Sequence, residues 1–329
     1  MSTIEFAILI VLLGLLFDYT NGFHDAANVV STIIATRALA PMAAIVLAAL
    51  LNTLGATQIS GVAHTIASGL VEEAAATQQI VLFAVVGAII WNFITWFFGL
   101  PSSSSYALIG GLIGAAVVEG GLGIVHWREL TNKVLIPMIV SPVIGFGAAY
   151  IFMRVIYRII KKRGEERRAK LFRYLQIASG SIMALSHGLN DAQKSMGIIT
   201  LGLFASGLVA STQIPLWVIL SCALMMGLGT ATGGFRIIHT VGFKITQLSP
   251  PQGFAAEVSA SLVILTASFL GMPISSSQMI VGSIGGVGVA KGSEHVQWKL
   301  GRRMVLTWIL TLPGAGIISA LTLLIFSIL

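Results

Sequence analysis

Two short stretches of the chain hold an aspartate in closely similar apolar surroundings. Residues 22–28 read Gly-Phe-His-Asp-Ala-Ala-Asn and contain Asp25, and residues 188–194 read Gly-Leu-Asn-Asp-Ala-Gln-Lys and contain Asp191. A carboxylate at the centre of a membrane helix costs about 3 kcal/mol and is rare unless it faces a partner or a cavity. The glycine that opens each stretch would allow a break in the helix, whose free carbonyl oxygens could join the carboxylate around a cation. We therefore expect a broken helix and a cation ligand at both places.

Two serine runs are repeated in the same way, and their chemistry is that of anion binding. Residues 99–105 read Gly-Leu-Pro-Ser-Ser-Ser-Ser, and residues 271–277 read Gly-Met-Pro-Ile-Ser-Ser-Ser. A proline can open a helix whose first turn exposes unpaired backbone N–H groups beside several hydroxyls. The glycine-rich stretches that follow suit re-entrant hairpins surrounded by protein. The alternative is that serine and glycine only permit close helix packing.

The two kinds of motif occur in the same order in each half of the chain, which favours an internal repeat. Two carboxylates and two anion-binding helix starts near one pseudo-two-fold axis would take up cations and an anion together. Cations at the carboxylates would remove their repulsion of the anion, so that the affinity for the anion depends on the cation. The sequence therefore predicts a symporter.

The elements that position these residues must lie in a membrane. The 329 residues are 56% hydrophobic and only 9% charged, whereas about 25% of an ordinary soluble domain is charged. The apolar runs predict an all-α polytopic membrane protein with about ten to twelve membrane segments. The first run lacks the basic flank and cleavage site of a secretory signal, so we expect a retained helix.

A basic segment, residues 154–173, divides the chain. It contains nine basic and two acidic residues, which account for the formal charge of +7. The positive-inside rule places it in the cytoplasm and both termini outside, with anionic lipid rather than nucleic acid as its partner. Each half then crosses the membrane an odd number of times. We predict two inverted repeats, at 1–153 and 174–329.

The two signatures, with His-Gly-Leu-Asn-Asp-Ala-Gln-Lys at 187–194, resemble those of the PiT inorganic phosphate transporters, bacterial branch. The resemblance covers nearly the whole chain. It implies symport of inorganic phosphate with sodium or protons across the inner (plasma) membrane, two re-entrant hairpins and no organic cofactor. It also implies two sets of ligands. The phosphate set is Ser104, Ser105, Ser276, Ser277, Gln193 and Asn28; the sodium set is Asp25, Asn28, Ser103, Asp191, Asn190 and Ser275.

Two departures from the repeat leave alternatives open. Lys194 replaces the amide of Asn28, and it either forms a one-turn ion pair with Asp191 or reaches the phosphate as a point charge. His24 stands where the second half keeps Asn190. It could relay protons, which keeps proton coupling open, or remain a neutral, hydrogen-bonded imidazole.

Other functions fit the sequence less well. The chain has neither a His-Glu-x-x-His helix nor a Gly-x-Ser-x-Gly elbow, so an intramembrane hydrolase is disfavoured and we predict no enzyme. An anion channel could also use repeated polar loops. Sulfate or a metal–phosphate complex are alternative substrates. Inverted-repeat transporters are often homodimers, and by that analogy we expect one here.

Overall fold

The computed structural model describes residues 2–160 and 165–328, and within these ranges the regular elements are helices, with one isolated β-bridge between Val71 and Val125. The first half contains, in chain order, a long helix, a bent pair of helices, a membrane span, a hairpin helix, a short helix and a final span. They are α1 (Thr3–Ala35), α2 (Pro41–Ala56), α3 (Gly61–Ser68), α4 (Gln78–Phe97), α5 (Ser104–Gly120), α6 (Trp127–Leu130) and α7 (Ile136–Ile160).

The second half repeats this order element by element. Its helices are α8 (Glu165–Ala205), α9 (Leu216–Thr232), α10 (Phe235–His239), α11 (Pro250–Phe269), α12 (Ser276–Lys291) and α13 (Trp298–Ile328). The bent pairs correspond closely, because α2 and α3 meet at 66° and α9 meets the segment that begins with α10 at 62°. Each half thus contains one broken helical segment and one serine-led helix.

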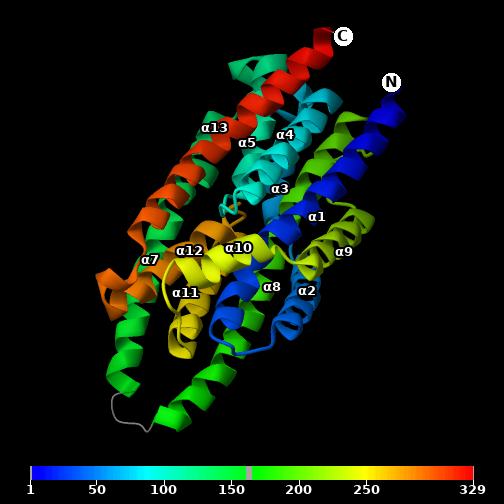
Figure 1. The fold of residues 1–329 in the computed structure, drawn as a ribbon. Coiled ribbons are helices and arrows are strands. Elements are labelled where there is room, and N and C mark those ends of the chain that lie inside the picture. Colours follow the sequence, from blue (N-terminus) through cyan, green and yellow to red (C-terminus); the bar gives the residue numbers. More distant parts are fainter. Residues whose placement is uncertain (1, 161–164, 329) are drawn as a thin grey trace.

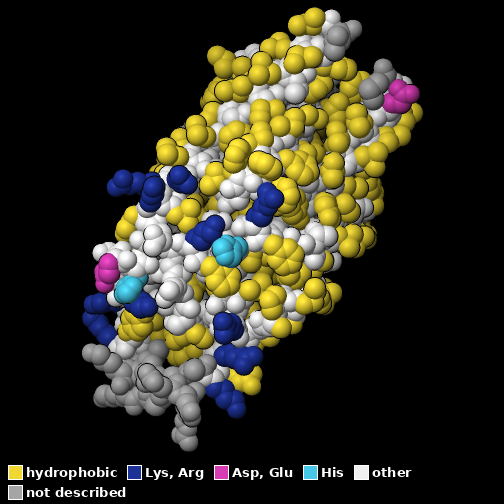
Figure 2. Space-filling model, in the orientation of Figure 1, with side chains coloured by type: hydrophobic (Ala, Val, Ile, Leu, Met, Phe, Trp, Pro, Cys, Tyr) yellow, Lys and Arg dark blue, Asp and Glu magenta, His cyan; other side chains and the backbone are white. Residues whose placement is uncertain are grey.

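The two halves run in opposite directions. In Figure 1, α1 descends from the N-terminus while α8 rises from the opposite end of the molecule, and the N- and C-termini lie at the same end. On the face shown in Figure 2, Lys and Arg side chains lie in the middle and lower parts, and hydrophobic side chains cover most of the upper part. This arrangement is that of an inverted repeat.

Local chemistry explains where the spans end and the serine runs begin. Gly99 and Gly271 adopt φ values of 63° and 66°, a left-handed conformation that glycine takes without steric cost. The residue after each glycine bonds back into the preceding helix, Leu100 N–H to Thr95 O at 3.0 Å and Met272 N–H to Ala267 O at 2.8 Å. The same C-terminal turn therefore stops α4 and α11 and directs the chain into the serine loop.

Five of the described helices are long and apolar enough to cross a membrane, and the number rises to seven if each bent pair is one span. We expected about ten to twelve membrane segments. The difference arises because the hairpin helix α5 is only 17 residues long. The long helix α8 begins with charged residues and carries polar side chains along its middle. The multi-pass, all-helical class is confirmed.

The last helix of each half packs against the hairpin helix of the other half. A Cβ atom added to Gly114 of α5 would lie 2.2 Å from the Gly316 carbonyl oxygen of α13, and one added to Gly286 of α12 would lie 2.2 Å from the Phe146 carbonyl oxygen of α7. Only glycine permits these backbones to approach so closely. These two contacts pack the halves against each other around the centre of the molecule.

Candidate functional site

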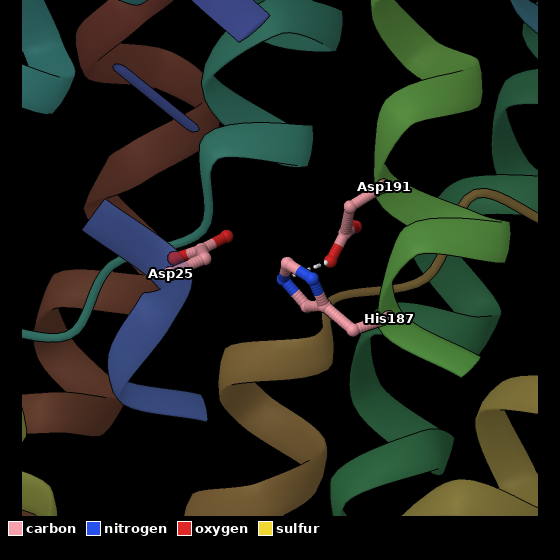
Figure 3. A group of neighbouring side chains, drawn as sticks. All are labelled: Asp25, His187 and Asp191. Carbon is pink, nitrogen blue, oxygen red and sulfur yellow. Dashed lines mark ion pairs between the residues drawn. The ribbon is translucent and has the colours of Figure 1, made fainter. Parts of the chain in front are cut away.

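The polar centre of the molecule lies where the middle of α1 faces the middle of α8. Asp25 of α1 is 2% exposed and Asp191 of α8 is 0% exposed, and the two carboxylates point toward one another with His187 between them (Figure 3). A buried carboxylate requires a partner or a ligand. The geometry therefore supports the choice of these two aspartates as functional residues.

The helices are not broken at this point, contrary to our expectation. Gly22 and Gly188 lie within the uninterrupted helices α1 and α8. A Cβ atom at Gly22 would lie 2.4 Å from the Met226 carbonyl oxygen of α9, and one at Gly188 would lie 2.0 Å from the Asn52 carbonyl oxygen of α2. The two glycines serve close helix packing, and the breaks lie in the α2–α3 and α9–α10 pairs.

The serine runs form the first turns of α5 and α12. The hydroxyl of Ser103 accepts a hydrogen bond from Tyr106 N–H at 3.2 Å, and that of Ser275 accepts one from Gln278 N–H at 3.3 Å. Both serines are therefore helix N-caps. The next residues, including Ser105 in α5, have backbone N–H groups that precede the intrahelical hydrogen bonds and lie at the positive end of the helix dipole.

One serine of each hairpin contacts the aspartate of the opposite half. Ser277 of α12 donates to Asp25 Oδ1 at 3.0 Å and accepts from Asn28 Nδ2 at 2.8 Å. Its repeat counterpart Ser105 of α5 donates to Asp191 Oδ1 at 3.5 Å. Ser277 contacts Asn28, and Ser105 contacts Lys194, which occupies the equivalent position of the repeat. The crossed contact between serine and aspartate therefore occurs twice, each time beside the residue three positions after that aspartate.

The middle serines break this symmetry. Ser276 donates to Asp191 Oδ2 at 2.5 Å and accepts from Asn28 Nδ2 at 3.2 Å, so that it links α1 to α8. Its counterpart Ser104 is buried, and its hydroxyl has no partner among the described residues. A buried polar group without a partner is rare and marks a place where a ligand can bind.

Lys194 is paired with Asp191, as one of our two alternatives predicted. Its ammonium nitrogen contacts Asp191 Oδ1, lies 2.5 Å from Ser105 Oγ and 2.9 Å from the Ile274 carbonyl oxygen, and is fully buried. The ammonium group has three N–H donors. These three oxygens therefore occupy all of them.

Two histidines complete the centre. His24 Nδ1 lies 2.8 Å from Asp25 Oδ1, and its Nε2 lies 3.3 Å from the Thr95 hydroxyl. His187 Nε2 lies 2.9 Å from Asp191 Oδ2. Ligand atoms of Asp25, His187 and Asp191 all lie within 4.8 Å of one another. Sequence reasoning gave His187 no role, although it belongs to the second signature.

Besides the N-cap serines Ser103 and Ser275, two residues of the predicted sets lie outside this cluster of contacts. Gln193 Oε1 accepts from Val62 N–H at 2.8 Å and Ala63 N–H at 3.1 Å, so that its side chain caps the start of α3. Asn190 Nδ2 donates to Ser268 Oγ at 2.7 Å. The predicted phosphate role of Gln193 does not suit this geometry, because its amide nitrogen, the donor that phosphate would need, donates to the Leu189 carbonyl oxygen at 2.5 Å.

Two further buried carboxylates were not assigned from the sequence. Glu257 of α11 is 0% exposed, accepts from Thr32 Oγ1 at 2.5 Å and also accepts from Ser179. Asp18 of α1 accepts from Ser195 Oγ at 2.7 Å. In the sequence, each of these residues is a single carboxylate in an apolar run, and this is the only feature that could have indicated it.

Comparisons with known proteins identify the family of the chain. Residues 21–319 match the "Phosphate transporter family". Curated relatives named "Probable low-affinity inorganic phosphate transporter" include one from Mycobacterium tuberculosis, 44% identical over 317 residues (96% of this chain, 76% of the relative). Another, from Rhizobium meliloti, is 41% identical over 324 residues, 97% of each chain. One from Bacillus subtilis is 40% identical over 317 residues, 95% of each chain.

A solved structure described as "The sodium-dependent phosphate transporter" has the same fold, with a TM-score of 0.88, 24% identity and coverage of 99% of this chain and 100% of that one. The family and the relatives are transporters rather than enzymes, and the resemblance drawn from the two signatures is confirmed. The chain is therefore a multi-pass membrane protein that belongs to the phosphate transporter family.

Proposed function

We propose that the protein imports inorganic phosphate by symport with sodium ions, with alternating access to a site between α1, α5, α8 and α12. The observation that carries this proposal is the crossed contact of the hairpin serines with the aspartates, Ser277 with Asp25 and Ser105 with Asp191. One hydroxyl on each side is shared between an anion-binding helix start and a carboxylate. Binding at either group must therefore affect the other.

Phosphate would bind at the first turns of α5 and α12. Their backbone amides and the hydroxyl of Ser104, which has no partner among the described residues, are donors that an anion needs. The hydroxyls of Ser105, Ser276 and Ser277 donate to the aspartates and would turn to phosphate when a cation binds there. The two helix dipoles add positive potential. Asn28 Nδ2 donates to Ser276 and Ser277 and so orients these two hydroxyls at the start of α12.

Sodium would bind at Asp25. A hard monovalent cation takes carboxylate, hydroxyl and carbonyl oxygens, and the side-chain oxygen of Asn28 is buried without a partner in the described chain. Sodium at this carboxylate would offset its repulsion of phosphate. Because the bare carboxylate and the anion repel one another, phosphate would require the cation in order to bind.

Radiolabelled phosphate uptake into proteoliposomes tests this function. An inward sodium gradient should drive saturable uptake, and Asp25→Asn should abolish it. Ser283→Ala is a matched control, because Ser283 lies on α12 and bonds to the Gly145 carbonyl oxygen instead of the site. Equal uptake with and without sodium would contradict the proposal, as would equal transport of sulfate.

A proton-coupled or metal–phosphate symporter is the second candidate. The specific observation in its favour is the group formed by Asp25, His187 and Asp191, whose carboxylate and imidazole atoms could hold a divalent cation. Uptake driven by a proton gradient in potassium buffer, or dependent on a divalent cation, would select this candidate over sodium symport.

The arrangement proposed for the membrane has residues 154–173 in the cytoplasm, both termini outside and the division into halves at this basic segment. A homodimer in the inner (plasma) membrane is part of the same proposal. The chain has one cysteine, Cys222, which is buried, so single-cysteine labelling is practicable. A membrane-impermeant thiol reagent should label Ser2→Cys in intact cells and should leave Lys170→Cys unlabelled until the cells are lysed.

A further inference from the structure

The surroundings of the Lys194 ammonium group are those of a bound cation. Its three contacts are a carboxylate oxygen of Asp191, the hydroxyl oxygen of Ser105 and the backbone carbonyl oxygen of Ile274. They come from α8, the start of α5 and the loop before α12. Carboxylate, hydroxyl and carbonyl oxygens are also the ligands preferred by hard metal cations.

The first half has no such group at the equivalent position. There Asn28 stands in place of Lys194, and its amide donates to Ser277 and Ser276. Asn28 brings no positive charge to Asp25, and its side-chain oxygen lacks a partner among the described residues. Asp191 thus has a lysine ammonium group beside it, whereas Asp25 has none.

We propose that Lys194 is a tethered cation that fills the cation site of the second half, so that only the Asp25 site binds a mobile sodium ion. The inference rests on the proposed symport function and narrows the sodium set predicted from the sequence. Because Lys194 neutralises Asp191, one mobile cation is enough to neutralise Asp25. The transport cycle then carries one fewer sodium ion than a protein with two open sites.

Direct binding of phosphate by Lys194 is the competing role, and the geometry disfavours it. The three ammonium hydrogens are directed to three protein oxygens, which leaves no donor for an anion. To release one, the side chain would have to abandon a fully buried contact. Lys194 therefore acts on phosphate through its charge and through Ser105, as a positioning residue.

Equilibrium binding of ²²Na⁺ to the purified protein in detergent, with saturating phosphate, tests the inference on the wild-type chain. We expect about one sodium ion per chain, lost in Asp25→Asn. Two ions per chain would overturn the tethered-cation role and leave sodium symport standing. No bound sodium would overturn both this role and the proposed sodium coupling, so the two failures are distinguishable.

A repeat-swap pair of variants provides an independent measurement. Lys194→Asn recreates the first-half residue and should open the second site, so that about two sodium ions bind and the Hill coefficient of sodium-dependent phosphate uptake rises from about one toward two. Asn28→Lys should close the first site, so that the variant binds no ²²Na⁺. If Lys194→Asn does not fold, the wild-type stoichiometry and Asn28→Lys still decide the question. An unchanged stoichiometry in a folded Lys194→Asn protein would overturn the inference.

Discussion

Ser277 and Asp25 lie 252 positions apart in the chain and are joined by a 3.0 Å hydrogen bond. The serine belongs to the first turn of α12 and the aspartate to the middle of α1, so this contact connects the anion-binding start of one half to the carboxylate of the other. A hydrogen bond to a charged acceptor contributes about 1.5–3 kcal/mol. In the proposed mechanism, sodium at Asp25 and phosphate at the start of α12 would affect one another through this contact.

Ser277→Ala removes this connection. Loss of one hydrogen bond to a carboxylate predicts a decrease of about 10- to 100-fold in kcat/KM for phosphate uptake. The KM for sodium should rise as well, because the same hydroxyl contacts Asp25. Uptake kinetics at varied sodium and phosphate concentrations measure both changes, with Ser283→Ala as the control. A change confined to one of the two substrates would contradict the shared role.

Asp191→Asn leaves the ammonium of Lys194 buried without a counter-charge. Breaking a buried ion pair from one side costs about 3–5 kcal/mol, so the thermal unfolding midpoint in detergent should fall sharply. The double variant Asp191→Asn/Lys194→Met removes both charges and should recover much of the loss. A single variant as stable as the wild type would show that the pair does not contribute to stability.

Gln193→Ala distinguishes a helix cap from a phosphate ligand. Because Gln193 caps the start of α3, we expect a loss of about 1 kcal/mol of stability and an unchanged KM for phosphate. The comparison is Ser105→Ala, which should raise that KM. An increase in KM for Gln193→Ala that matches Ser105→Ala would restore the role predicted from the sequence.

Gly286→Ala tests the packing of α12 against α7. The added methyl group would overlap the Phe146 carbonyl oxygen, and overpacking of this kind costs about 1–3 kcal/mol. Gly147 lies on α7 with nothing within 4 Å of an added Cβ atom, so Gly147→Ala is the matched control and should be neutral. Equal thermal midpoints for the two variants would refute the close contact.

The repeat and the main residues of the central cluster were accessible from the sequence because they are residue types that recur at equivalent positions, whereas the crossed contacts between the halves were not predicted. Asp25 and Asp191 were identified in this way, and Lys194 was correctly expected to be able to pair with Asp191. The serine runs were predicted as helix starts, and α5 and α12 begin there. These features follow from local chemistry and need no knowledge of distant neighbours.

Other features depend on which helix lies opposite. Gly22 could equally break a helix or admit another backbone, and only the position of α9 decides between them. Gln193 appeared free to bind phosphate until α3 was placed beside it. Glu257 has the apolar Val85 at the corresponding position of α4, so the internal repeat does not identify it.

The central claim is that phosphate and sodium move together through the cluster around Asp25. Its most direct test is to load proteoliposomes with phosphate, place equal sodium on both sides and follow ²²Na⁺ as phosphate leaves. Linked transport predicts that the outward phosphate gradient drives net movement of sodium out of the liposomes although its concentration is initially equal on both sides, and that Asp25→Asn abolishes this movement. Phosphate efflux without any net movement of sodium would contradict the account.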